Sequence, residues 1–253
     1  MTRLAVVPVL LLTGCAGAAD TEPLQDGSRN SRVSFPDGVS VEAPCSSSAE
    51  QLDGRDNNCN GEADEGFWAR VFGAPFSSLT QAHPGCTVET AFSAHCNSAA
   101  HRTCHKLGYV GGFGPVEFDS STGFVVCLAS ATRIAASHAA LTASHPGCTA
   151  STAFSLACSS AIHRLCVANG FVTGVGPVEH GVAPTAVCIS HAQLSQVSFA
   201  TLASHHDGCA AAHSFGAGCR AAIHRFCVAA GHATGFGPVE QGTDAWIACL
   251  DAE

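Results

Sequence analysis

Hydrophobic and polar positions repeat three times along the later two-thirds of the chain. The stretch LTQAHPGCTVETAFSAHCNSAAHRTCHKLGYVGGFGPVE at 79–117 returns, with substitutions, at 141–179 and at 202–240, so the offsets are 62 and 61 residues. Each copy contributes four cysteines, and the first three keep the same spacing in every copy. Self-similarity at a fixed period marks a repeated structural unit, so we expect three units that share one fold.

Each unit has a helical pattern followed by β-rich segments. In the second unit four apolar residues recur at every fourth position: Phe154, Cys158, Ile162 and Cys166. This stripe predicts a helix over 150–168. Gly170 stands where a left-handed C-terminal cap is expected, and Gly108 and Gly231 occupy the same place in the other units.

The segments after the helix predict a turn and a strand. The sequence GPVE is expected to form a Gly/Pro turn, and the last cysteine lies in a β-rich run: GFVVCLA, TAVCIS or AWIACL. We expect a further strand before the helix, near FSSLT (76–80) and VSFATLA (197–203). Each unit is therefore predicted to be a small α+β module of about 61 residues, and sixty residues make a marginal core.

Disulfides are expected to staple these small cores. Cys158 and Cys166 are eight residues apart on one helix, about 12 Å along its axis, which is too far for a disulfide. Two connectivities remain open, and we favour first-to-second with third-to-fourth, because the first cysteine precedes the helix and the third faces the last strand. The expected pairs are Cys86–Cys96, Cys104–Cys127, Cys148–Cys158, Cys166–Cys188, Cys209–Cys219 and Cys227–Cys249.

The amino-terminal segment has the pattern of an export signal. Arg3 is followed by an apolar run from Leu4 to Leu12, which is too short to span a bilayer as a helix. The run ends in LTGC, which resembles the lipobox of bacterial lipoproteins. The resemblance implies a signal peptide over 1–14 and a lipid-modified Cys15. An ordinary secreted protein is the alternative. Ala16 follows the cysteine, and the resemblance then favours the outer membrane or cell surface.

Composition narrows the possible partners. The chain holds 11 Lys and Arg against 20 Asp and Glu, with a formal net charge of −9. Nucleic-acid binding requires clustered positive charge, so we expect no nucleic-acid partner. Fifteen cysteines in an exported chain indicate an oxidising compartment. Residues 15–44 are rich in Ser, Gly, Pro and Asp, and we expect them to form a flexible, disordered tether.

The acidic stretch DGRDNNCNGEADEG at 53–66 has the spacing of a calcium loop. Asp56, Asn58 and Asn60 take alternate positions, and Gly61 and Asp64 follow at the sixth and ninth. Position 12 is a phenylalanine rather than the glutamate of an EF-hand, so this is not an EF-hand. A solvated acidic turn is the alternative interpretation.

The same stretch resembles the MopE-type metal-binding motif, DGxDNxCxGxxDE, of bacterial surface proteins. The motif is matched at Asp53, Gly54, Asp56, Asn57, Cys59, Gly61, Asp64 and Glu65. The family carries a cysteine where this chain has Leu52, and we expect Cys45 to pair with Cys59 instead. Hard oxygen ligands favour a structural calcium over 45–66. The candidate ligands are Asp53, Asp56, Asn58, Asn60, Asp64 and Glu65.

Four polar positions recur in all three units: two histidines, an arginine and a glutamate. They are His83, His101, Arg102, Glu117, His145, His163, Arg164, Glu179, His206, His224, Arg225 and Glu240. Two imidazoles and a carboxylate are a possible zinc site. The set is alternatively a pocket for a glycan or an anionic ligand. We favour a structural interpretation, in which Arg pairs with Glu to lock the loop after the helix and His caps a turn.

The sequence thus predicts an anchored chain with three α+β units, at 67–131, 132–192 and 193–253. No catalytic constellation is evident, so we expect a non-enzymatic protein that binds a glycan or protein at the cell surface, or acts in adhesion. Phe113 and Phe236 are candidates for sugar contacts. Two alternatives remain: a metal-dependent hydrolase or metal-sequestering protein, and a passive coat or spacer of the envelope.

Overall fold

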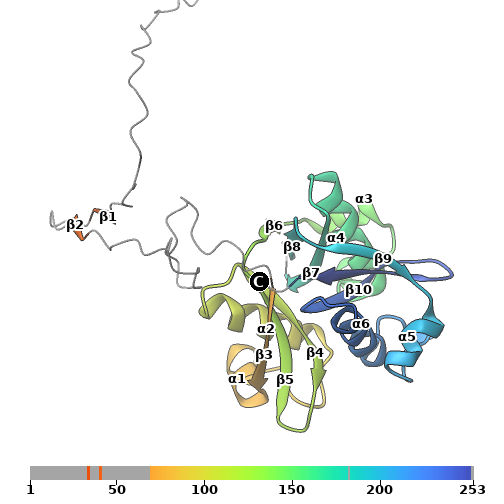
Figure 1. Ribbon diagram of the computed structural model, residues 1–253. Coiled ribbons are helices and arrows are strands. Elements are labelled where there is room, and N and C mark those ends of the chain that lie inside the picture. Colours follow the sequence, from red (N-terminus) through yellow and green to blue (C-terminus); the bar gives the residue numbers. More distant parts are fainter. Residues whose placement is uncertain (1–32, 35–39, 42–68, 182, 252–253) are drawn as a thin grey trace, which may run out of the picture.

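The computed structural model describes residues 33–34, 40–41, 69–181 and 183–251, and this part of the chain has a mixed α+β fold. Two short strands, β1 (Val33–Ser34) and β2 (Ser40–Val41), pair antiparallel. All other described elements fall into three similar units (Figure 1). Within the described residues no helix is long and apolar enough to cross a membrane.

The first unit has the order strand, helix, helix, strand, strand. Its elements are β3 (Ala69–Pro75), α1 (Phe76–Ala82), α2 (Ala94–Lys106), β4 (Gly111–Phe118) and β5 (Thr122–Leu128). The three strands form an antiparallel sheet in the order β3-β5-β4. The last strand along the chain is therefore the central strand of the sheet.

The other two units repeat this plan. The second contains β6 (Thr132–Ala135), α3 (His138–Ser144), α4 (Leu156–Ala168), β7 (Thr173–Glu179) and β8 (Thr185–Ile189). The third contains β9 (Gln193–Val197), α5 (Phe199–His205), α6 (Ala217–Ala229), β10 (Thr234–Gln241) and β11 (Ala245–Leu250). Short 3-10 helices, η1 (Ala150–Thr152) and η2 (Ala211–His213), precede α4 and α6. The sheet orders are β6-β8-β7 and β9-β11-β10.

The helix predicted over 150–168 is wrong at its start. Residues 150–152 form η1, and α4 begins only at Leu156. Ser155 has an extended backbone, and its hydroxyl accepts the Cys158 N–H, so it is the N-cap of the helix. The left-handed glycines after the helices are confirmed, because Gly108, Gly170 and Gly231 have φ values of +94°, +86° and +96°.

The further strand expected before the long helix is present but ends earlier than predicted, because β3 stops at Pro75 and β9 stops at Val197. The segments at 76–80 and 199–203 are helical, since Phe76 begins α1 and Phe199 begins α5. Their buried leucines, Leu79 and Leu202, follow three residues after each phenylalanine, which is helical spacing. The Gly-Pro segments lie inside β4, β7 and β10 rather than in turns. The proline peptides are cis, and the strand register shifts around them.

Six cysteine pairs stand at disulfide distance, two in each unit. They are Cys86–Cys96, Cys104–Cys127, Cys148–Cys158, Cys166–Cys188, Cys209–Cys219 and Cys227–Cys249, the connectivity favoured from the sequence. The second pair of each unit joins its long helix to the central strand. The expected Cys45–Cys59 pair lies outside the described residues.

Each sheet lies between two cores. One face covers a core within its own unit, where the cysteines pack against a fully buried leucine: Leu79, Leu141 or Leu202. The other faces meet in a single core shared by all three units (Figure 1). The central strands contribute to it equally, with Val126, Leu128, Val187, Ile189, Ala248 and Leu250.

The units also interlock in a cyclic order. Helix α2 of the first unit packs on β7 of the second, α4 of the second on β10 of the third, and α6 of the third on β4 of the first. The last unit therefore contacts the first, and the described part of the chain forms a closed ring with approximate threefold symmetry. We call the line through the centre of this ring the axis.

Candidate functional site

The repeated arginines and glutamates meet across the unit interfaces. Arg102 of the first unit donates to both carboxylate oxygens of Glu179 in the second, at 2.5 and 2.8 Å. Arg164 binds Glu240 of the third unit in the same way, at 2.5 and 3.0 Å. The carboxylate partner raises the pKa of Arg102 and of Arg164. Arg therefore pairs with Glu, as the structural interpretation expected, and the structure adds that each arginine reaches the glutamate of another unit.

Each arginine also holds the chain before the first cysteine of its own unit. The Nη1 atom of Arg102 donates to the Ala82 carbonyl at 3.0 Å, and that of Arg164 to the Ser144 carbonyl at 3.1 Å. Each arginine thus joins the end of a short helix in its own unit to the second strand of the neighbouring unit, β7 or β10.

The histidines before the first cysteines close tight turns. The Nδ1 atom of His83 accepts the Gly85 N–H at 3.2 Å. The Nδ1 atoms of His145 and His206 likewise accept the N–H of the glycine two residues further on, both at 3.1 Å. Burial, the Arg102 charge and the neighbouring His95 lower the pKa of His83, whereas Glu179 opposes this change.

The helix histidines lie at the interfaces, where His101 is buried and His163 and His224 are half-buried. His163 Nδ1 is 2.9 Å from the Thr173 hydroxyl, and His224 Nδ1 is 2.9 Å from that of Thr234. In the first unit Gly111 replaces the threonine, so within the described residues His101 Nδ1 has no hydrogen-bond partner. Burial lowers the pKa of all three histidines.

The candidate metal residues are only partly placed. Within residues 69–181 and 183–251, no three His, Cys, Asp or Glu side chains gather in a way that could hold a metal ion. The calcium-type ligands between Asp53 and Glu65, and the lipidation candidate Cys15, lie outside the described residues.

A cleft lies at the interface between the second and third units. It has a volume of about 250 Å³ and is lined by His163, Leu194, Val239, Glu240 and Trp246. Trp246 is 41% exposed and lies opposite Glu240 on one neighbouring strand and opposite Gln196 on the other. Residues in register on adjacent strands share a face, so these three side chains form one row beside His163.

The equivalent of Trp246 differs in every unit. Phe124 faces Glu117 in the first unit, and Thr185 faces Glu179 in the second. Trp246 was not among the site residues expected from the sequence. The sequence signal that could have indicated Trp246 is that the residue at this repeat position changes from unit to unit, while the glutamate that it faces is repeated. Phe113 and Phe236, proposed from the sequence for sugar contacts, are instead buried and pack edge to face, with ring centroids 5.2 Å apart.

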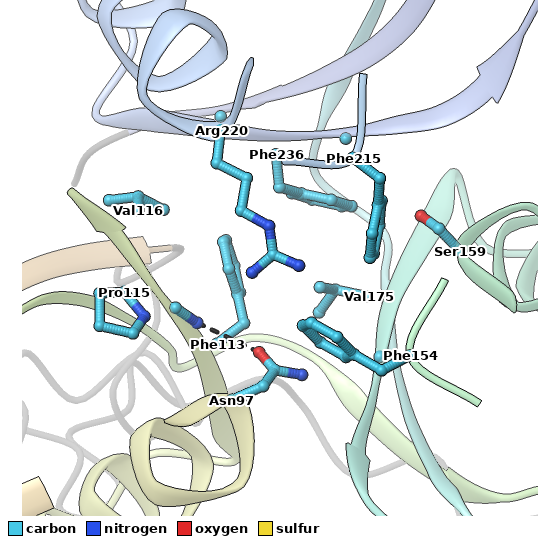
Figure 2. Close-up of a pocket in the computed structure, with 14 residues that line it drawn as sticks. Asn97, Phe113, Pro115, Val116, Phe154, Ser159, Val175, Phe215, Arg220 and Phe236 are labelled. Carbon is cyan, nitrogen blue, oxygen red and sulfur yellow. Dashed lines mark hydrogen bonds between the residues drawn. The ribbon is translucent and has the colours of Figure 1, made fainter. Parts of the chain in front are cut away.

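A second cavity lies on the axis, where the beginnings of the three long helices converge (Figure 2). Asn97, Ser159 and Arg220 occupy equivalent positions in α2, α4 and α6. Asn97 donates to the Pro177 carbonyl at 2.8 Å, and Ser159 donates to the Pro238 carbonyl at 2.9 Å. Two of the three positions thus tie one unit to the proline segment of the next.

Arg220 departs from this pattern. Its guanidinium extends into the cavity, toward Asn97 and between the phenylalanine rings (Figure 2). The guanidinium carbon is 4.7 Å from the ring centroid of Phe154, 4.8 Å from that of Phe215 and 5.9 Å from that of Phe92. Burial among these groups lowers the pKa of Arg220 to about 10. Arg220 was not among the site residues expected from the sequence, although it is a charged residue aligned with Asn97 and Ser159 in the repeats.

Comparisons with protein-family models, with curated proteins and with solved structures give no match for this chain.

Proposed function

We propose that this protein is a non-enzymatic binding protein of the bacterial envelope, and that its ring of three units binds a glycan in the Trp246 cleft. The observation that carries the proposal is a large exposed indole in a cleft with polar side chains on both sides. An amphipathic ring of this kind offers an apolar face at little entropic cost. The apolar C–H face of a sugar ring can stack on it, while the sugar hydroxyls contact the polar neighbours.

The polar groups around Trp246 suit hydroxyl recognition. Glu240 lies on one side of the indole in the sheet, and Gln196 lies on the other. His163 comes from the neighbouring unit, and its Nδ1 atom is engaged by Thr173, which fixes the ring and leaves Nε2 as the atom available to a ligand. Donors and acceptors thus alternate around one aromatic platform, which favours a polyhydroxylated ligand over an apolar one.

The state of Glu240 supports binding rather than catalysis. Both oxygens of its carboxylate accept N–H groups from Arg164. A carboxylate held by a bidentate arginine is stabilised in its ionised form and in one orientation. It is therefore suited to accept hydrogen bonds from a ligand, and poorly suited to donate a proton as a general acid.

A glycan array probed with the full chain tests the proposal. We expect the wild-type protein to bind a subset of glycans and Trp246→Thr to lose about tenfold or more in affinity, the size of effect typical of an aromatic hot spot. Threonine is the matched replacement because Thr185 holds this position in the second unit. Phe124→Thr, the corresponding change in the first unit, is the control and should leave binding unchanged. An array without signal, or equal binding by Trp246→Thr, would contradict the proposal.

The envelope location rests on the amino-terminal sequence. We propose that the LTGC sequence directs lipid attachment at Cys15 and that residues 16–44 tether the ring outside the membrane. Metabolic labelling with a fatty acid should mark the wild-type protein in a bacterial host, and Cys15→Ser should remove the label and release the protein from the membrane fraction. Retained label in Cys15→Ser would rule out this anchor.

A further inference from the structure

Arg220 is a partly buried cationic side chain at the centre of the ring. Within residues 69–181 and 183–251, no hydrogen bond or ion pair reaches its guanidinium, whereas Arg102, Arg164 and Arg225 all pair with glutamates. Taking a charge out of water is costly unless an opposite charge or hydrogen bonds compensate for it. The three phenylalanine faces compensate for only a part of this cost.

The stacking leaves the hydrogen-bond donors of Arg220 available. Cation–π contacts use the planar face of the guanidinium, while its N–H groups point outward in the plane. In Figure 2 the guanidinium points into the cavity, and no Asp or Glu is among the lining residues. The nearby polar groups are already engaged, since Asn97 and Ser159 bind backbone carbonyls and the Gly114 N–H binds Asn97. Arg220 is therefore the donor that faces the empty space.

The surroundings of the cavity are electropositive. Helices α2, α4 and α6 begin beside it, and the positive ends of their dipoles lie near the axis. Ser93 and Ser155 cap the first two helices, but Gly216 at the start of α6 offers no side-chain cap. The helix that carries Arg220 is thus the one whose first N–H groups lack a side-chain acceptor.

The size of the cavity limits the ligand. The centre of a water-sized sphere can occupy about 40 Å³ of this cavity, where one water molecule needs roughly 10–15 Å³ on the same measure. A nucleotide or a sugar ring is too large for this space, whereas a small inorganic anion is not. Arg220 itself is only partly buried as a residue, so the cavity is in contact with solvent.

We propose that the axial cavity binds one small monovalent inorganic anion of halide size, held by the guanidinium of Arg220. The anion neutralises the unpaired charge and fills the space between the phenylalanine rings, and so it stabilises the junction of the three units. This site is separate from the Trp246 cleft, and the test of anion binding does not depend on whether the cleft binds a glycan.

The repeats themselves supply the matched variant. Arg220→Asn places in the third unit the residue that the first unit carries at the same helix position, and Arg220→Ser places there the residue of the second unit. Both residues are compatible with this position of the fold. Lys106→Gln is the control, because it removes one positive charge from the end of α2, away from the axis.

Thermal unfolding of the full, oxidised chain in sodium chloride and in sodium gluconate at equal ionic strength tests the site, because gluconate is too large to enter. We expect a higher Tm in chloride for the wild type and for Lys106→Gln, and no such difference for Arg220→Asn and Arg220→Ser. Crystals soaked in sodium bromide should show an anomalous peak beside the guanidinium. Equal chloride effects in wild type and Arg220→Asn, or no bromide at Arg220, would overturn the proposal.

Discussion

Arg225, in the last helix of the chain, donates from Nε to the carboxylate of Glu117 in the first unit. The same contact joins Arg102 to Glu179 and Arg164 to Glu240. Each unit therefore forms an ion pair with the next, and the third forms one with the first. Arg225 also holds the His205 carbonyl at 3.2 Å, as the other two arginines hold the corresponding carbonyls. This ion pair therefore closes a ring whose members are far apart in sequence.

Breaking the closing pair should destabilise the protein modestly. Arg225 is 49% exposed and Glu117 is 24% exposed, and partly exposed ion pairs contribute about 0.2–1 kcal/mol. A double-mutant cycle with Arg225→Gln and Glu117→Gln, followed by urea unfolding of the oxidised protein, should give a coupling energy in this range. The cycle Arg102→Gln and Glu179→Gln is the internal comparison and should give the same value. Coupling at the second pair but none at the first would mean that the ring is open.

One glycine on the second strand of each unit (β4, β7 and β10) should not tolerate any side chain. A Cβ atom on Gly174 would lie 2.2 Å from Cys166 Sγ, and Gly112 and Gly235 stand equally close to the corresponding bridges. Because both the bridge and the strand are fixed, Gly174→Ala should lower the free energy of unfolding by about 1–3 kcal/mol, the usual effect of overpacking. Gly242→Ala, where a Cβ would meet no atom within 4 Å, is the control. Equal unfolding midpoints in denaturant for the two variants would refute the close packing described here.

Acidification should destabilise the ring before any carboxylate titrates. Burial lowers the pKa of His101, His163 and His224 below 6.5, so the folded state binds fewer protons than the unfolded state. Stability is then fully present above 6.5 and is lost as the pH falls through that value toward the lower folded pKa. The free energy of unfolding should therefore decrease between pH 7.5 and 5.5.

Imidazole NMR signals measure the cause of this effect directly. The midpoints of His163 and His224 should lie below 6.5 in the folded protein, because protonation must occur in a half-buried site at the interface. His163→Asn keeps a polar side chain opposite Thr173 without a titrating group, and it should reduce the slope of stability against pH. Midpoints at or above 6.5, or stability that increases on acidification, would contradict the burial of these histidines.

The sequence was sufficient to predict the disulfide connectivity of each unit and the end of its long helix. Cysteine spacing on a helix removed one disulfide connectivity, and the favoured one of the remaining two places Cys166 against Cys188. The glycine after the apolar stripe marked the end of α4. The start of the helix was missed because the apolar period continues through Phe154 across Ser155, and a cap outweighs periodicity at a helix end.

The sequence could not predict how the units meet. Because Arg102 and Arg164 are repeated with their glutamates, pairing within a unit and pairing between units give the same pattern in one chain. Only the three-dimensional order of α2, β7 and the following elements distinguishes the two. The Trp246 cleft and the Arg220 cavity both lie at such interfaces. In the sequence they were detectable only as residues that depart from the repeat. Each site is completed by side chains of a neighbouring unit, such as His163 beside Trp246.

The acidic stretch at 53–66 precedes the ring, and its interpretation as a calcium loop remains a prediction. Side chains at alternate positions of DNNCNG should converge on one hard cation, so Asp56→Asn removes one charged ligand. Terbium binds in calcium sites, and its luminescence can be excited through a tryptophan as close in sequence as Trp68. We expect calcium to quench this signal in the wild type, and Asp56→Asn to weaken calcium binding by about tenfold or more.

Asp37→Asn removes the same charge outside the motif and should bind calcium like the wild type. The two variants separate a specific site from a general attraction between the acidic chain and cations, because general attraction depends on net charge alone. If the stretch is only a solvated acidic turn, calcium binding should weaken slightly and equally in both variants. Added salt should then abolish the remaining terbium signal. If the ligands converge on one cation, Asp56→Asn should bind calcium more weakly than Asp37→Asn at every salt concentration.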